Sequence, residues 1–193
     1  MPPIPDRKLE ERILNVAQRL WRTRGDKGLT LRAVAREART TTPTLYKRFQ
    51  NKKALRLALS LRVRDEMNAE LFSSPRLEDV YRRYLRYAEQ HPHEYELLQL
   101  AWAPYVLVPG NNRPGRTWVL SQLAARFGGE PDEYAQFFDT LFLTCHGAAT
   151  VLVATEDARA RQTIRDNCIR ACDSLMEHVH IFLDSRKPAR PRA

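Results

Sequence analysis

Glycine is scarce in this sequence, and the glycine motifs that cradle nucleotide phosphates are missing. Only seven glycines occur in 193 residues, and they form neither Gly-x-Gly-x-x-Gly nor Gly-x-x-x-x-Gly-Lys-Ser/Thr. Both motifs let a backbone approach a phosphate closely, so their absence argues against a nucleotide-dependent α/β enzyme. No Ser-His-Asp or Cys-His arrangement is recognisable either. We therefore expect no cofactor and no catalytic residues.

Cysteine is equally scarce, and this excludes a disulfide framework. Cys145, Cys168 and Cys172 are too few, and odd in number, for paired disulfides. Cys168 and Cys172 share a helix face at a spacing of i,i+4, but no matching His or Cys pair follows at zinc-site spacing. We expect no metal site. Small buried packing is the favoured role for these two thiols, with thiol sensing as the alternative.

The sequence has no long uninterrupted apolar run. The N-terminus, Met1–Lys8, has no apolar stretch behind its basic residues and does not resemble a secretory signal. The longest apolar region, Leu141–Ala154, is interrupted by polar residues. It is also shorter than the ~20 residues that span a bilayer. The sequence predicts a soluble, cytoplasmic protein that makes no membrane contact.

Positive charge is abundant but unevenly placed. The chain carries a net charge of +9, yet residues 1–64 hold 17 Lys and Arg against five Asp and Glu. Residues 65–193 hold 15 basic and 18 acidic residues. The whole positive excess therefore lies in the first third of the chain, which indicates an anionic partner for that part.

Apolar residues recur at helical spacing along almost the whole chain, and no alternating run is long enough for a sheet. The sequence predicts an all-α fold. We expect a basic three-helix domain at 1–64, a larger helical domain at 65–184 and a disordered basic tail at 185–193. The expected helices run from Leu9 to Gly25 and over 31–38, 42–49, 52–71, 77–90, 94–103, 116–127, 132–154 and 158–184.

Two short helices with a tight turn between them lie inside the basic domain. Thr30 can cap the first and Thr41 the second, with Pro43 in the first turn of the second helix, where a missing N–H costs nothing. Asn51 can cap the helix that follows. This arrangement is typical of a helix-turn-helix, in which the second helix enters the major groove of DNA. A helical domain with a solvated basic face is the alternative.

The residues of this module resemble those of the TetR family of transcriptional regulators. The resemblance covers roughly residues 8–58. It is carried by Gly28-Leu29-Thr30-Leu31-Arg32-Ala33-Val34-Ala35 and by Thr41-Thr42-Pro43-Thr44-Leu45-Tyr46-Lys47-Arg48-Phe49-Gln50-Asn51-Lys52-Lys53-Ala54-Leu55. One position departs from the pattern, because Arg39 stands in the turn where the family often has Gly. We expect the turn to be altered there.

The resemblance implies a DNA-contacting role for nine residues. Arg32 is implied to reach a guanine edge, and its planar guanidinium suits O6 and N7. Lys47 is implied to reach either a base or a phosphate. The positions implied to lie against bases are Thr42, Pro43 and Thr44, and those implied to contact the DNA backbone are Thr30, Thr41, Tyr46 and Lys52.

The resemblance also implies that the larger domain dimerises and binds a small effector. The segment Phe142–Ala149, preceded by His91–Leu98, is similar to the subgroup with a Trp-His-Gly signature, although Cys145 stands in place of Trp. A hydrophobic or aromatic effector is expected, with His146 as its polar anchor. Plain core packing is the alternative for every member of the expected pocket, which consists of Tyr95, Trp102, Trp118, Phe127, Phe142 and His146. Glu94 and Glu96 are expected to be helix-start charges.

Two apolar stripes favour a homodimer built on a four-helix interface. Each stripe can instead face the core of its own domain. The first stripe is Phe138, Leu141, Phe142, Cys145, Ala149 and Leu152, and the second is Ile164, Cys168, Ala171, Cys172, Leu175, Val179 and Phe182.

The sequence is compatible with three functions: a ligand-responsive repressor on a palindromic operator, a sequence-indifferent architectural DNA binder, and a helical enzyme with an incidental basic domain. The motif favours the first.

Overall fold

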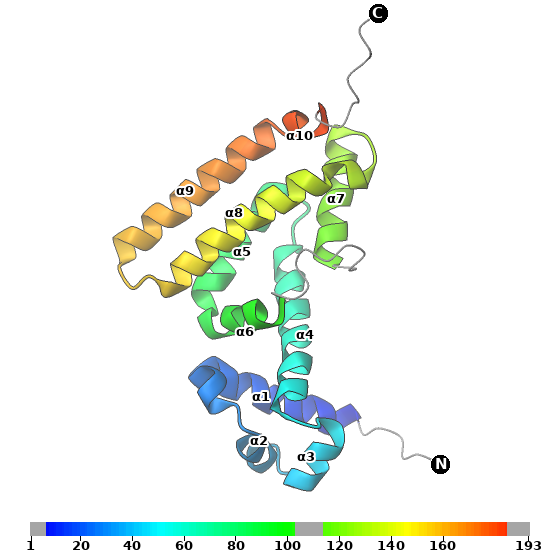
Figure 1. Cartoon of the computed structure of the whole chain (residues 1–193), viewed down its shortest axis with the longest axis vertical. Coiled ribbons are helices and arrows are strands. Elements are labelled where there is room, and N and C mark those ends of the chain that lie inside the picture. The colour runs from blue at the N-terminus through cyan, green and yellow to red at the C-terminus, as the bar shows by residue number, and fades with distance from the viewer. Residues whose placement is uncertain (1–6, 103–113, 185–193) are drawn as a thin grey trace, which may run out of the picture. The chain divides into compact units, whose positions relative to one another are not determined.

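The computed structural model describes residues 7–102 and 114–184, with the side chains of 101 and 102 left out. All regular structure within these two ranges is helical, as expected (Figure 1). The expected loop at 104–115 and the tail at 185–193 lie almost wholly outside the described residues. The helices are α1 (Arg7–Gly28), α2 (Leu31–Glu37), α3 (Thr42–Arg48), α4 (Lys52–Leu71), α5 (Leu77–Gln90), α6 (Pro92–Trp102), α7 (Pro114–Phe127), the 3₁₀ turn η1 (Pro131–Tyr134), α8 (Ala135–Ala154), α9 (Ala158–Glu177) and α10 (His180–Asp184).

The chain forms two compact units, and the first contains α1 to α3, most of α4, and α6. The apolar face of α1 provides the centre of this unit, because Ile13, Ala17 and Trp21 are almost fully buried. Gly25 interrupts α1 as expected, but with a kink at a φ of 56° rather than a stop, and one more helical turn follows. The other buried apolar residues are Leu9, Val16, Leu20, Leu29, Val34, Ala35, Ala38, Leu45, Phe49, Leu55, Leu59, Val63, Met67, Tyr95, Leu97 and Leu98.

Glu94 attaches α6 to α1. Its side chain is only 1% exposed, and its Oε1 accepts hydrogen bonds from Gln18 Nε2 at 2.8 Å and Arg22 Nε at 2.7 Å. His91 Nδ1 lies 3.2 Å from the other carboxylate oxygen. Glu94 lies in the first turn of α6, as expected of a helix-start charge, and its carboxylate is in addition buried and paired. Although α6 follows the sequence boundary after residue 64, it packs with the first unit.

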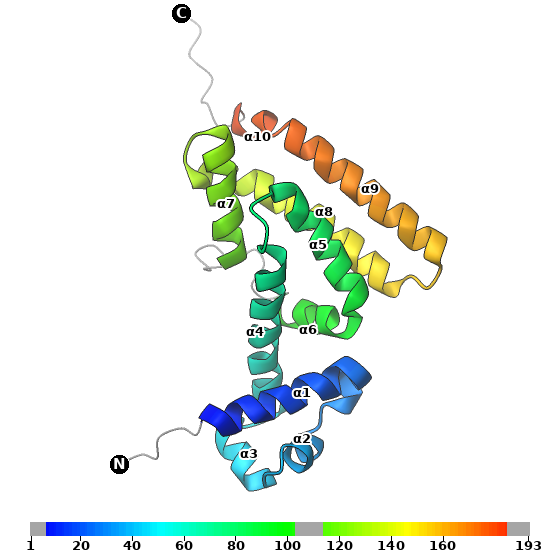
Figure 2. The ribbon, with the colours of Figure 1, turned by 180° about the vertical axis from the view of Figure 1, so that it is seen from behind.

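The second unit contains α5 and α7 to α10. Figures 1 and 2 show α8 and α9 lying antiparallel and side by side, with α5 next to α8. Two charged contacts fix α9 to α5: Arg82 on α5 pairs with Asp173 at 2.9 Å, and Arg165 pairs with Glu89. The expected helix 158–184 is divided in two, because the chain leaves helical geometry at His178 before α10 begins.

Most of the apolar stripes on α8 and α9 belong to the core of the second unit itself. Cys145, Ala149 and Leu152 on α8 are buried within the single chain, and so are Cys172 on α9 and Val179 in the turn after it. For these residues the alternative to a dimer interface holds, because they pack in the core of their own domain. Apolar side chains elsewhere on α8 remain outside this core, with Leu143 and Val151 each 51% exposed.

One helical stretch within the described ranges, Pro131–Ala154, is long and apolar enough by composition to cross a bilayer. This stretch is longer than the apolar region Leu141–Ala154 because it also includes η1 and the first turns of α8. A core helix of a soluble protein meets the same two conditions. Here α8 packs against α5 and α9, and 28% of the apolar window is buried.

We predict that Glu94→Ala destabilises the first unit, because it leaves the buried amide of Gln18 without one of its acceptors. An unsatisfied buried donor lowers the free energy of unfolding by about 1–3 kcal/mol. Thermal and urea unfolding of the full chain, followed by circular dichroism, measures this loss. Glu96→Ala on the same helix is the control, since Glu96 is exposed. Surface changes of that kind usually remain within ~0.5 kcal/mol. Equal stability of the two variants would contradict the prediction.

Candidate nucleic-acid interface

Two threonines set the starts of α2 and α3, as the sequence predicts. Thr30 Oγ1 accepts a hydrogen bond from the Ala33 N–H at 3.1 Å, and Thr41 Oγ1 accepts one from the Thr44 N–H at 3.2 Å. Each bond satisfies one of the free N–H groups of a helix start. Pro43 stands in the first turn of α3, where its fixed φ suits the helix.

The turn between the two helices depends on Arg39. Its φ is 50°, in the left-handed region that favours glycine. Arg39 N–H donates to the Arg36 carbonyl at 3.2 Å, and Thr40 N–H donates to the Ala35 carbonyl at 2.9 Å. This pair of bonds is a Schellman motif, which normally has glycine at the left-handed position. The turn therefore keeps its ordinary geometry, and the expectation of an altered turn is wrong; what changes is that a non-glycine residue adopts a strained conformation.

The buried side of the two helices determines which side chains face outward. Val34, Ala35 and Ala38 on the α2 side are buried, as are Leu45 and Phe49 on the α3 side. Six of the nine residues implied to contact DNA are exposed: Thr30, Arg32, Thr41, Pro43, Tyr46 and Lys47. Tyr46 is 48% exposed although it is a large aromatic residue. Thr42, Thr44 and Lys52 are partly exposed. The candidate interface is the outward face formed by α2, α3 and the turn between them.

Lys52 is positioned by an acidic residue of α1. Its Nζ donates to the Asp26 carboxylate at 2.9 Å and to the Asp26 carbonyl at 2.8 Å. The hydrogen bond from Lys52 is the largest of the influences that lower the pKa of Asp26, and Arg56 adds to it. An ammonium has three donors, so one remains for a phosphate oxygen. The pair holds Lys52 at the N-terminus of α4, where free N–H groups also favour an anion.

The expected effector residues fall into both units. Tyr95 lies on α6 in the first unit, and Trp102 ends the same helix without a described side chain. In the second unit, Trp118 packs against Phe72 with ring centroids 4.7 Å apart. Phe127 is exposed at the end of α7.

Phe142 and His146, two of the expected effector residues, are in contact in the second unit. Their rings stack with centroids 5.4 Å apart. Tyr84 OH lies 3.0 Å from His146 Nδ1, and burial lowers the pKa of His146. A neutral imidazole in an aromatic setting suits an uncharged ligand. The role of all six residues in effector binding stays a prediction.

One shallow pocket lies elsewhere in the second unit. It is lined by Pro75 and Arg76 just before α5, by Leu77 and Glu78 at its start, and by Gln122, Ala125 and Arg126 from α7. Arg126 pairs there with Glu78, and Arg76 adds a further positive charge to the lining. The pocket shares no residue with the expected effector set.

Sequence spacing missed one member of a side-chain cluster. Cys145 on α8 meets Cys168 and Cys172 of α9, and the sulfurs of all three lie within 4.8 Å of one another. The sequence relates Cys168 to Cys172 by helical spacing, but Cys145 joins them only because α8 and α9 pack together. Its place on the apolar stripe of α8 was the one available signal.

A capped helix-turn-helix with a basic outward face, joined to a larger helical unit, defines a class of DNA-binding transcriptional regulators. Residues 13–59 match the family model described as bacterial regulatory proteins, tetR family. Residues 13–59 are therefore a DNA-binding domain of the tetR type, which supports a role for the chain in the regulation of transcription. No curated protein sequence is significantly similar to it.

Solved structures show the same fold over nearly the whole chain. A tetR-family transcriptional regulator from Streptomyces coelicolor superposes with a TM-score of 0.66 at 16% identity, covering 97% of this chain and 94% of that one. A TetR transcriptional regulator from Rhodococcus sp. RHA1 gives 0.61 at 19% identity, covering 89% and 98%. Neither likeness tests the Trp-His-Gly subgroup, which stays a prediction.

We predict that Arg39→Gly raises the free energy of unfolding slightly. A left-handed non-glycine residue costs about 1–2 kcal/mol, and the greater chain entropy of glycine offsets ~0.5–1 kcal/mol of the relief. Urea unfolding of the full chain measures the difference. Arg36→Gly removes the same charge from the helical end of α2 and should lower stability by about 1 kcal/mol. If both variants lose stability equally, Arg39 does not adopt the left-handed turn in solution.

Proposed function

We propose that the protein is a homodimeric repressor that binds a palindromic operator and releases it when a small effector binds. The exposure of Arg32, Pro43, Tyr46 and Lys47 on helices whose opposite faces are buried carries the first part of the proposal. A helix-turn-helix that presents these groups can place α3 in the major groove. The excess of 17 basic over five acidic residues in 1–64 supplies attraction to phosphate.

Each group on the interface has chemistry that suits one part of the duplex. The guanidinium of Arg32 can donate to O6 and N7 of guanine. Thr42, Pro43 and Thr44 form the N-terminal tip of α3, and a thymine methyl can pack against their methyl and ring carbons. Tyr46 OH and Lys52 Nζ can donate to phosphates and fix the register of α3. Lys47 can reach a base or a phosphate.

Dimerisation is supported by the apolar side chains of α8 that the single chain leaves exposed. Leu143 and Val151 follow each other at a spacing of i,i+8 with Gly147 between them, so the three share one helix face. An isologous interface buries the same face of both copies. Two-fold symmetry also suits a palindromic operator, because it relates the two α3 helices as it relates the two half-sites.

Effector release requires that the ligand bind two conformations with different affinity. The expected aromatic set around Phe142 and His146 supports an uncharged aromatic or hydrophobic ligand. The second candidate function, an architectural binder indifferent to sequence, uses the same basic surface. The match of residues 13–59 to the tetR family model favours the regulator over both this alternative and a helical enzyme.

We predict that selection from a random duplex library recovers a palindromic site. Arg32→Ala should then weaken binding to that site by about 1–3 kcal/mol and relax the preference at one base pair, because Arg32 is proposed to contact a base edge. Tyr46→Phe should weaken operator and scrambled duplex by the same factor, because the lost hydroxyl is proposed to contact a phosphate. Fluorescence anisotropy across salt concentrations measures both effects.

Arg86→Ala is the control for lost charge, since Arg86 is exposed on α5 in the second unit. It removes one positive charge and should leave operator affinity unchanged. A selected pool without a common sequence, bound with steep salt dependence, would establish the architectural alternative. Normal operator binding by Arg32→Ala and Tyr46→Phe together would place the interface elsewhere.

We predict that Leu143→Glu separates the dimer, because it places a charge in the proposed apolar interface while Leu143 is already exposed in the single chain. Sedimentation equilibrium should give a dimer for the wild type and a 22.4 kDa monomer for the variant. Leu57→Glu on α4 is the matched control, since Leu57 is 47% exposed but lies outside α8. A dimeric Leu143→Glu variant would exclude this face.

A further inference from the structure

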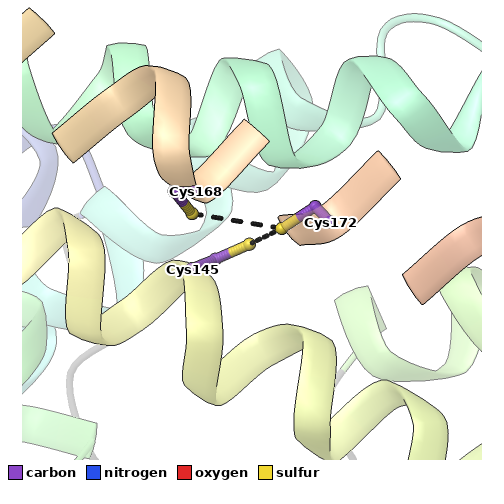
Figure 3. A group of neighbouring side chains, drawn as sticks. All are labelled: Cys145, Cys168 and Cys172. Atoms are coloured by element: carbon purple, nitrogen blue, oxygen red, sulfur yellow. Dashed lines mark hydrogen bonds between the residues drawn. The ribbon is translucent and has the colours of Figure 1, made fainter. Parts of the chain in front are cut away.

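Three sulfurs meet inside the second unit. Cys145 Sγ lies 3.5 Å from Cys172 Sγ, and Cys168 Sγ lies 4.0 Å from Cys172 Sγ. Figure 3 shows the three side chains pointing toward one another from α8 and α9. All three residues are buried. Free thiols commonly pack singly in a core, but three sulfurs that all lie within 4.8 Å of one another form a set of soft ligands.

The sulfurs interact mainly with one another. Hydrogen bonds from Cys145 and Cys172 lower the pKa of Cys168 to about 4, and the contact with Cys168 raises the pKa of Cys145. For Cys172 the bond with Cys145 lowers the pKa, but the bond with Cys168 and burial outweigh it and raise the pKa to about 12. The other charged group among the main influences is the carboxylate of Asp173.

The sulfur positions suit an ion that binds three ligands. Bonds of about 2.3 Å from a central ion to three thiolates place the sulfurs ~4 Å apart when the ion lies in their plane, and closer when it lies above the plane. The observed separations of 3.5 and 4.0 Å match this range. Among the described residues, the group that can hold an ion at this place has three members. Zinc normally takes four ligands in a protein.

Charge decides which three-coordinate ion fits. Three thiolates leave a charge of minus two around a monovalent ion and minus one around a divalent ion. A buried charge without a partner costs several kcal/mol. A trivalent ion gives a neutral complex, and no cation is among the main influences on these thiols within the described part of the chain. We propose that Cys145, Cys168 and Cys172 form a binding site for a trivalent thiophilic metalloid ion, of the kind supplied by arsenous acid.

The binding reaction balances without an oxidant. Arsenous acid, As(OH)₃, and three thiols give one As(S-Cys)₃ group and three waters. Each step forms one As–S bond and breaks one As–O bond, and the thiol proton leaves with the hydroxide as water. The site and its test do not depend on the DNA-binding function.

The test titrates full-length reduced protein with inorganic arsenite, without oxygen and with a phosphine as reductant. Calorimetry should give one arsenic per chain, and X-ray absorption at the arsenic edge should give three sulfur neighbours and no oxygen. This second measurement uses the wild-type protein and does not depend on any variant folding. Arsenic bound by two sulfurs and an oxygen, or no binding by protein with three free thiols, would overturn the proposal.

Variants then test each ligand. Cys145→Ser, Cys168→Ser and Cys172→Ser should each weaken arsenite binding by about 10²-fold or more, because each removes one arm of a preorganised chelate. Ala148→Ser is the control, since it adds a hydroxyl to α8 and keeps all three thiols. Circular dichroism shows whether each variant folds. Unchanged affinity in a folded Cys→Ser variant, or a Cys145–Cys172 disulfide in place of arsenite binding, would refute the three-sulfur site.

Discussion

The packing of Leu45 and Phe49 is the interaction on which the candidate interface depends. The helix α3 has seven residues, and isolated helices shorter than about 12–15 residues are marginal in water. Its existence therefore rests on burial of one side against the first unit, together with the cap from Thr41. The same burial turns Pro43, Tyr46 and Lys47 outward, so that stability and presentation of the interface have one cause.

The first unit is held together by polar as well as apolar contacts. Glu94 joins Gln18 and Arg22 of α1 to α6, a helix from much later in the chain. Near the C-terminal end of α1, Asp26 fixes Lys52 at the start of α4. Asp26 lies in the strongly basic first third of the sequence, whereas Glu94 lies beyond it, and each carboxylate positions a neighbouring helix.

Local signals in the sequence were enough to predict the helix-turn-helix. The caps at Thr30, Thr41 and Asn51 were all predicted, and each is confirmed by a hydrogen bond to a backbone N–H. Caps and helical spacing act over a few residues, so one sequence shows them. The effect of Arg39 was misjudged because the hydrogen bonds of the turn tolerate a left-handed arginine. The DNA-contacting roles themselves stay predictions.

Contacts between distant segments were beyond the sequence. Nothing in the spacing of Glu94 shows that Gln18 lies beside it, and Cys145 meets Cys172 across 27 positions. The apolar stripes show the same limit, because helical spacing identifies a buried face but not the neighbour that covers it. Most of that face packs within the chain, while Leu143 and Val151 stay exposed. The aromatic effector set, divided between two units, was grouped by residue type alone.

The length of α3 limits how much sequence one copy of the protein can read. Seven helical residues extend about 10 Å at 1.5 Å per residue, which is the rise of roughly three base pairs of DNA. Three base pairs have only a few dozen distinct sequences and recur throughout any genome. A single chain therefore has too little information to mark one promoter. Two half-sites at a fixed separation square the number of sequences that one half-site distinguishes, and the spacing between the half-sites becomes a further part of the recognised signal.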